Sequence, residues 1–308
     1  MVYCYMWVSD LVWFGLWVVA LGGSDFIYYD LDRGVRSRDI GLLFDDWMGG
    51  DERVAVLSPH DDDALLGVGY LISALIQEGC ETYVIIYCDG RGGYSTLEEK
   101  DTIVSKRRVE SRNAYRRLGI EEENIIRFEY PDFSLRSYIG WLLPNNMEGT
   151  MPKTLKTLRK IKPTRMIIPN EYREHIDHEA LSIIGSYDGP QVGDAVLVEW
   201  GKPHRVRSYL KYSVWGDFSP EDALVKGRKT ALRGNVAVKA KPEVEGRIIR
   251  SLKEFKSQER IIDQLVEIRS ERFTGDGYIE VYLKFNPRPR IDYTEYKRRI
   301  SEIDRKSS

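Results

Sequence analysis

Short apolar runs alternate with longer amphipathic segments between residues 53 and 200. A run such as Tyr83–Cys88 is too short for an average helix and is typical of a buried strand. The segment Ala64–Glu78 instead repeats its apolar residues every three or four positions and stops at Gly79, which predicts a helix. The same patterns predict strands over 54–58, 83–88, 125–128, 166–169 and 195–199, and helices over 64–78, 104–118, 155–161 and 177–186.

Strands that are separated by helices of this length are joined by right-handed crossovers and pair side by side in one direction. The sequence therefore predicts an α/β fold with a mostly parallel β-sheet flanked by helices. After Gly201 the pattern is less regular, and we expect an α+β cap on the same domain. This cap would contain helices over 244–257 and 259–268 and a strand over 278–285.

The amino-terminal 23 residues are apolar and aromatic, and their role is ambiguous. No Lys or Arg precedes the apolar run, which argues against a signal peptide, and Asp10 interrupts it, which argues against a spanning helix. We expect a cytoplasmic protein, with export or membrane anchoring through residues 1–23 as the alternative. The predicted organisation is an N-terminal apolar extension over 1–52 and a single domain over 53–308.

Composition narrows the range of partners. The 308-residue chain has 46 Lys and Arg against 48 Asp and Glu, so its formal net charge is −2. No global field would attract nucleic acid or an anionic membrane, and we expect neither as a partner. The three cysteines fit no zinc-finger spacing, and we expect Cys80 and Cys88 to be buried free thiols.

Three aspartates directly follow a histidine where the first predicted strand ends, in the segment His60–Asp63. Ligands of open α/β sheets bind at the carboxyl ends of the strands, so this cluster lies where a site is expected. Adjacent carboxylates repel each other, and a bound cation would relieve that repulsion. Aspartates at a helix start are also ordinary caps, but three beside a histidine favour a site.

A second cluster, Pro169–Ala180, follows the fourth predicted strand and contains His175 and His178. Residues three apart on a helix share a face, and the parallel strands would bring this cluster to the same edge as His60. Two histidines and one carboxylate are the protein ligands of a catalytic zinc site with an open position. Zinc lowers the pKa of its bound water to about 7, and a second carboxylate could take the proton.

The two clusters together resemble the PIG-L/LmbE-like family of zinc-dependent N-acetylglucosaminyl de-N-acetylases. The family signatures His-Pro-Asp-Asp-Glu and His-Pro-Asp-His correspond here to His60–Ala64 and His175–His178. Four further motifs fit in order: Asp89-Gly90, Arg107-x-x-Glu110 with Ala114 and Leu118-Gly119, Tyr130-Pro131-Asp132, and Phe255-Lys256-Ser257-Gln258. The resemblance covers roughly residues 53–260 and implies a Rossmann-like, LmbE-like fold whose part after residue 200 shapes the substrate site.

The resemblance also implies a zinc-dependent hydrolase that removes an N-acetyl group from an N-acetylglucosamine-type sugar or conjugate. By this resemblance, the zinc ligands would be His60, Asp63 and His178, and the general base would be Asp62. His175, tuned by Asp177, would be the electrophilic partner of the oxyanion. Arg107 and Asp132 would hold the sugar.

The chain departs from the family at three positions. Asp61 and Ile176 replace the usual prolines of the two signatures, and Ala64 replaces a glutamate. None of these changes removes a ligand or the base, although the loss of proline should loosen the loops and Asp61 adds a carboxylate near the metal.

Two other classes of function stay open at this point. A catalytically silent α/β binding or regulatory module could keep the metal, but it would not need Asp62. A Mg²⁺-dependent phosphoesterase could also use an acidic cluster, although two histidines favour zinc. Arg107 could equally belong to a solvated basic helix face. The sequence does not identify the N-acylated substrate or decide whether the protein forms a homo-oligomer.

Overall fold

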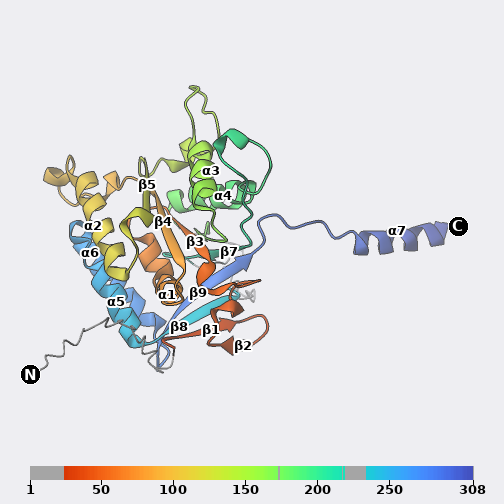
Figure 1. Ribbon diagram of the computed structural model, residues 1–308, viewed down its shortest axis with the longest axis horizontal. Coiled ribbons are helices and arrows are strands. Elements are labelled where there is room, and N and C mark those ends of the chain that lie inside the picture. Colours follow the sequence, from red (N-terminus) through yellow and green to blue (C-terminus); the bar gives the residue numbers. More distant parts are fainter. Residues whose placement is uncertain (1–23, 173, 217, 219–233, 308) are drawn as a thin grey trace, which may run out of the picture.

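The computed structural model describes residues 24–172, 174–216, 218 and 234–307. In this part of the chain, nine strands form one sheet in the order β2-β1-β8-β9-β7-β6-β3-β4-β5, with helices packed on both faces (Figure 1). The strands are β1 (Phe26–Asp30), β2 (Val35–Ser37), β3 (Arg53–Ser58), β4 (Glu81–Cys88), β5 (Ile125–Tyr130), β6 (Arg165–Pro169), β7 (Ser208–Tyr212), β8 (Val236–Ala240) and β9 (Tyr278–Phe285).

The half of the sheet from β7 to β5 is parallel, as the sequence predicted. The central strand β3 pairs with β4 on one side and with β6 on the other, both in the parallel direction. Its alternate residues serve two cores: Val54 and Val56 pack into one, and Ala55 and Leu57 into the other. Because both faces of β3 are covered by helices, the strand is apolar throughout its centre.

The other half of the sheet is antiparallel, so the prediction of a mostly parallel sheet was wrong. Strand β9 runs antiparallel to both β7 and β8, and β1 runs antiparallel to β8 and β2. Hydrophobic periodicity identified the strand at Tyr278–Phe285, but periodicity carries no information about strand direction. The sheet is therefore mixed.

The predicted strand over Ala195–Glu199 is also wrong. This segment leads into a 3-10 turn, Val198–Trp200, and Leu197 before it has a left-handed backbone (φ 51°). The buried guanidinium of Arg159 donates to carbonyls of this loop, which fixes the loop without a strand partner. These carbonyls belong to Gln191, Val192, Asp194, Val196, Leu197 and Gly201. Strand β7 takes the fifth parallel place instead.

The helices form two layers over the sheet (Figure 1). One layer contains α1, α2, α5 and α6, and the other contains α3 and α4. Their bounds are α1 (Asp63–Gln77), α2 (Ile103–Leu118), α3 (Thr150–Ile161), α4 (Ile176–Gln191), α5 (Pro242–Leu252) and α6 (Glu259–Arg269). All six were predicted, although α5 ends five residues earlier than expected. A seventh described helix, α7 (Thr294–Ser307), was not predicted and stands away from the body of the molecule.

Residues 24–52, which we assigned to an N-terminal extension, contribute β1 and β2 to the sheet, so the boundary at residue 53 does not coincide with the edge of the fold. Glu52 is completely buried against the guanidinium of Arg165, with 2.8 Å between Oε1 and Nη2. The prediction for residues 1–23 falls outside the described residues. Among the described helices, none has the length and apolar character needed to span a bilayer.

Candidate metal centre and active site

The two predicted clusters meet at the carboxyl edge of the parallel strands. His60 follows β3, His175 caps the start of α4 after β6, and β3 and β6 are neighbours in the sheet. Ser58 shapes the first turn, because its hydroxyl donates to the carbonyl of His60 and accepts the backbone N–H of Ala64. The side chain of Asp62 makes no capping hydrogen bond, so its carboxylate is not used in the way an ordinary cap would be.

The three predicted metal ligands converge. Asp63 Oδ2 lies 3.0 Å from Nδ1 of His60 and 3.0 Å from Nε2 of His178. One donor atom from each residue lies within 4.8 Å of the other two. His178 is fully buried, and neither of its ring nitrogens has an aligned hydrogen-bond partner among the described residues. Buried nitrogens left in this way fit a cation, and the His-Asp-His donor set suits zinc.

The charges of the three residues support this interpretation. Burial works to raise the pKa of Asp63, but His178 and His60 together hold it well below its usual value. Burial also opposes charge on His178, yet Asp63 and Glu174 raise its pKa to about 9. The carboxylates around His178 thus favour positive charge at this point, which a bound cation would supply.

Glu174 orients His178, and the sequence reasoning missed it. Its side chain is completely buried, and Oε2 lies 3.1 Å from Nδ1 of His178. The carboxylate also accepts backbone N–H groups from the loop after β7, at Val214, Trp215 and Gly216. Carboxylates in this position commonly orient a metal-binding histidine. Its position four residues before His178 on the way into a helix was the available signal.

Asp177 connects the two histidine-bearing turns. Its Oδ2 lies 3.2 Å from Nε2 of His60 and 3.6 Å from Nδ1 of His175. The carboxylate also accepts the backbone N–H groups of Phe133 (2.6 Å) and Leu135 (3.0 Å), which ties the turn after β5 to the site. Asp177 was predicted to tune His175, and in the structure it contacts His60 more closely.

His175 is arranged as a hydrogen-bond donor. Its Nδ1 accepts the backbone N–H of Asp177 at 3.2 Å, so in the neutral ring the proton is on Nε2. Burial and the nearby His60 lower the pKa of His175, which favours this neutral form. The ring is a quarter exposed and meets the Phe133 ring edge-on, with 4.5 Å between centroids.

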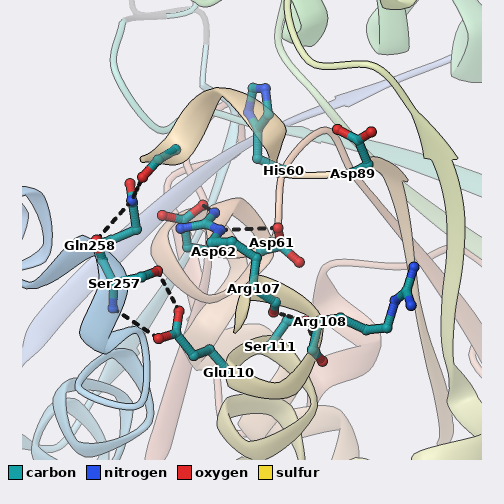
Figure 2. A network of polar contacts seen from close by, with 12 residues as sticks. His60, Asp61, Asp62, Asp89, Arg107, Arg108, Glu110, Ser111, Ser257 and Gln258 are labelled. Atoms are coloured by element: carbon teal, nitrogen blue, oxygen red, sulfur yellow. Dashed lines mark hydrogen bonds and ion pairs between the residues drawn. The ribbon is translucent and has the colours of Figure 1, made fainter. Parts of the chain in front are cut away.

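Asp62 is held by Arg107 (Figure 2). Arg107 Nη2 donates to Asp62 Oδ1 at 3.2 Å, and Arg107 Nε donates to Asp61 Oδ2 at 3.1 Å. Burial raises the pKa of Asp62 despite the opposing charge of Arg107. Arg107 is buried and not on a solvated helix face, and its Nη1 has no hydrogen-bond partner among the described residues.

Asp132 follows β5 and lies against the glycine turn after β4, at the same edge of the sheet. Its two carboxylate oxygens accept the backbone N–H groups of Gly90 (2.9 Å) and Gly92 (2.8 Å). Gln258 donates to the carbonyl of Gly93 in this turn, as Figure 2 shows. In the same view Glu110 accepts from the backbone and hydroxyl of Ser257. The predicted late motif therefore packs against the turn that holds Asp132.

Comparison with known families identifies this arrangement. Residues 55–186 match the PIG-L family, described as GlcNAc-PI de-N-acetylase. The matched segment, less than half of the chain, is similar to that family. It contains both clusters, Arg107 and Asp132, while Ser257 and Gln258 lie outside it.

Solved structures share the fold of this segment and of the surrounding chain. The N,N'-diacetylchitobiose deacetylase from Pyrococcus horikoshii is 18% identical with a TM-score of 0.61, over 81% of this chain and 88% of that one. The conserved protein TT1542 from Thermus thermophilus is 20% identical with a TM-score of 0.53, over 79% and 98%. GalB, the 4-carboxy-2-hydroxymuconate hydratase from Pseudomonas putida, is 15% identical with a TM-score of 0.55, over 78% and 99%.

A comparison with curated protein sequences gave no significant match. Because a deacetylase and a hydratase share this fold, the fold alone does not select the reaction. The side chains of the site have to select it.

Proposed function

We propose that this protein is a zinc-dependent hydrolase that removes an N-acetyl group from an N-acetylglucosamine-type amino sugar or conjugate. The observation that carries the proposal is the convergence of His60, Asp63 and His178 beside Asp62, whose carboxylate is outside the ligand set and makes no capping hydrogen bond. The PIG-L match supports the same reaction class.

The donor set fits a single divalent ion held by His60, Asp63 and His178. When bound there, zinc would supply an activated water by lowering its pKa to about 7. Two imidazole nitrogens beside one carboxylate favour zinc over Mg²⁺, which prefers oxygen ligands. A phosphoesterase is therefore the weaker alternative.

Side chains of the protein would supply the general base, the oxyanion contact and the sugar contacts. Asp62 is the general base, and burial raises its pKa above the ordinary value, which favours proton uptake. The Nε2–H of His175 donates to the oxygen that becomes negative when the amide is attacked. The unpartnered Nη1 of Arg107 and the carboxylate of Asp132 are the groups that would bind sugar hydroxyls.

The test is hydrolysis by purified, zinc-loaded protein of a panel of N-acetylated sugars and conjugates, scored by release of acetate and of free amine. Asp62→Asn is expected to lower kcat by about 100-fold or more while it keeps one zinc per chain, because only the base is removed. Asp101→Asn, on an exposed loop, is the matched control and should leave kcat unchanged.

Three outcomes separate the alternatives. Loss of hydrolysis with retained zinc in Asp62→Asn supports the enzyme. A wild-type protein that binds zinc but hydrolyses nothing in the panel supports the silent binding module. Metal analysis that finds Mg²⁺ in place of zinc supports the phosphoesterase.

A further inference from the structure

Asp61 stands where the resembling family has a proline, and its carboxylate is completely buried. A buried carboxylate is costly unless it is paired, and Asp61 has two cationic partners. Arg107 from α2 donates to Oδ2 at 3.1 Å, and Arg127 from β5 donates to Oδ1 through Nη1. Each oxygen of Asp61 therefore has its own arginine.

Arg107 is shared between two carboxylates. Its Nε contacts Asp61 and its Nη2 contacts Asp62 at 3.2 Å, and both contacts are visible in Figure 2. The guanidinium lies over the ring of Phe255, with 5.3 Å from Cζ to the ring centroid, which restricts its plane. The position of Arg107 thus depends on how strongly each carboxylate attracts it.

Arg127 affects how strongly Asp61 attracts Arg107. Besides Asp61, its Nη1 donates to the hydroxyl of Ser111 (2.9 Å) and its Nε donates to Glu129 (2.9 Å), so the guanidinium is anchored from several directions. The contact with Arg127 neutralises part of the charge of Asp61, which weakens its attraction for Arg107.

The glycine turn closes this pair from solvent. Gly90 has a left-handed backbone (φ 78°), and a Cβ placed there would lie 2.7 Å from Oδ2 of Asp61 and 3.1 Å from Cβ of Arg107. The close approach of the turn keeps the contacts dry, which strengthens them.

We propose that Asp61 and Arg127 are positioning residues for Asp62 that act through Arg107. This inference rests on the proposed function, because it takes Asp62 as the general base. Without Arg127, Asp61 attracts the whole guanidinium and Arg107 leaves Asp62. Without Asp61, Arg107 turns fully onto Asp62 and occupies the carboxylate that must accept a proton. In both cases the base is misplaced, although the metal ligands stay intact.

The test is a double-mutant cycle with Asp61→Asn and Arg127→Met. Each single variant is expected to lower kcat by about tenfold or more, because the base is misplaced. KM reports separately on the sugar contact proposed for Nη1 of Arg107, and a change in KM alone does not account for the loss. In the Asp61→Asn background, Arg127→Met is expected to change kcat by less than about twofold, because its effect passes through Asp61. Arg112→Met, on the exposed side of α2, is the matched control.

Effects of the two substitutions that multiply would overturn the inference, as would a rise in KM at unchanged kcat. A second readout needs no substrate: in a crystal structure of Arg127→Met, Arg107 should have moved from Asp62 onto Asp61. An unmoved Arg107 refutes the inference whatever the activity. A wild-type protein without hydrolytic activity, combined with a moved Arg107, counts against the proposed function and leaves the positioning chain supported.

Discussion

Glu174 contacts His178, a proposed metal ligand, and the loop after β7, and its side chain is completely buried. Glu174→Gln keeps the size of the side chain but removes its charge. We expect zinc affinity to fall about 10- to 100-fold, because the imidazole loses the carboxylate that orients it. Competition with a chelating dye measures this, and Glu179→Gln on the exposed side of α4 is the control. Equal affinities for wild type and Glu174→Gln would contradict the assignment.

Asp188 makes stability depend on pH. Burial raises the pKa of this α4 carboxyl to about 7 from its ordinary 3.8. The folded state therefore binds the proton more tightly, and stability falls as pH rises from about 4 to 7. Asp188→Asn should raise the free energy of unfolding by up to about 4 kcal/mol above pH 7. Urea unfolding should show this advantage shrinking towards pH 4, and a gain that is equal at all pH values would refute the cause.

At the residue scale, the sequence predicted the candidate metal ligands but not the residues that orient them. His60, Asp63 and His178 converge as predicted because parallel strands bring their carboxyl ends to one edge. Arg127 and Glu174 were missed because their partners come from loops and strands whose packing no local pattern encodes. The roles of the site residues stay predictions until the variants are measured.

Among the elements, α1 shows how closely a helix approaches the sheet. A Cβ at Gly67 would lie 2.4 Å from the buried ring of Tyr212, so Gly67→Ala should destabilise the protein by about 1–3 kcal/mol. Gly246 on α5 faces only the end of Arg250, and Gly246→Ala should stabilise it by about 0.5–1 kcal/mol. Urea unfolding of the two variants measures the change in the free energy of unfolding for each. If both variants were less stable than wild type, the packing argument would be wrong.

The elements that the sequence predicted correctly are those with long, unbroken patterns. The apolar stripe of α1 and the run of β4 are examples. The strands β1, β2, β7 and β8 were missed. Phe26–Asp30 mixes aromatic and acidic residues, and Ser208–Tyr212 mixes aromatic residues with Ser208 and Lys211, so neither forms an unbroken apolar run. The fifth predicted strand failed because its β-branched residues form a loop whose carbonyls are held from outside.

For the whole molecule, the two ends of the described chain differ in how much they contribute to stability. Phe26 and Tyr28 of β1 are buried in the core beside α1 and α5, whereas α7 stands away from the body in Figure 1. Deleting residues 1–38 should lower Tm by several degrees, because it removes two buried aromatic side chains worth about 2 kcal/mol each. Deleting residues 291–308 should change Tm by less than about 2 °C. Calorimetry of both truncated proteins tests this prediction. Equal decreases in Tm would contradict it.

The antiparallel half also explains why the cap prediction was incomplete. Strand β9 joins β8 to the parallel half through β7, so the late part of the chain continues the sheet in addition to covering it. Reading the chain in order suggested a core followed by a cap, because sequence order does not reveal which strands become neighbours.

The arginine at position 159 fastens the 191–201 segment by its main chain alone. Every amino acid has the same backbone carbonyl oxygen, so these hydrogen bonds do not depend on the side chains of the segment. The exposed positions Val196 and Val198 should tolerate replacement, whereas Arg159→Lys, with three N–H bonds to offer in place of five, would leave much of the segment without its hydrogen bonds.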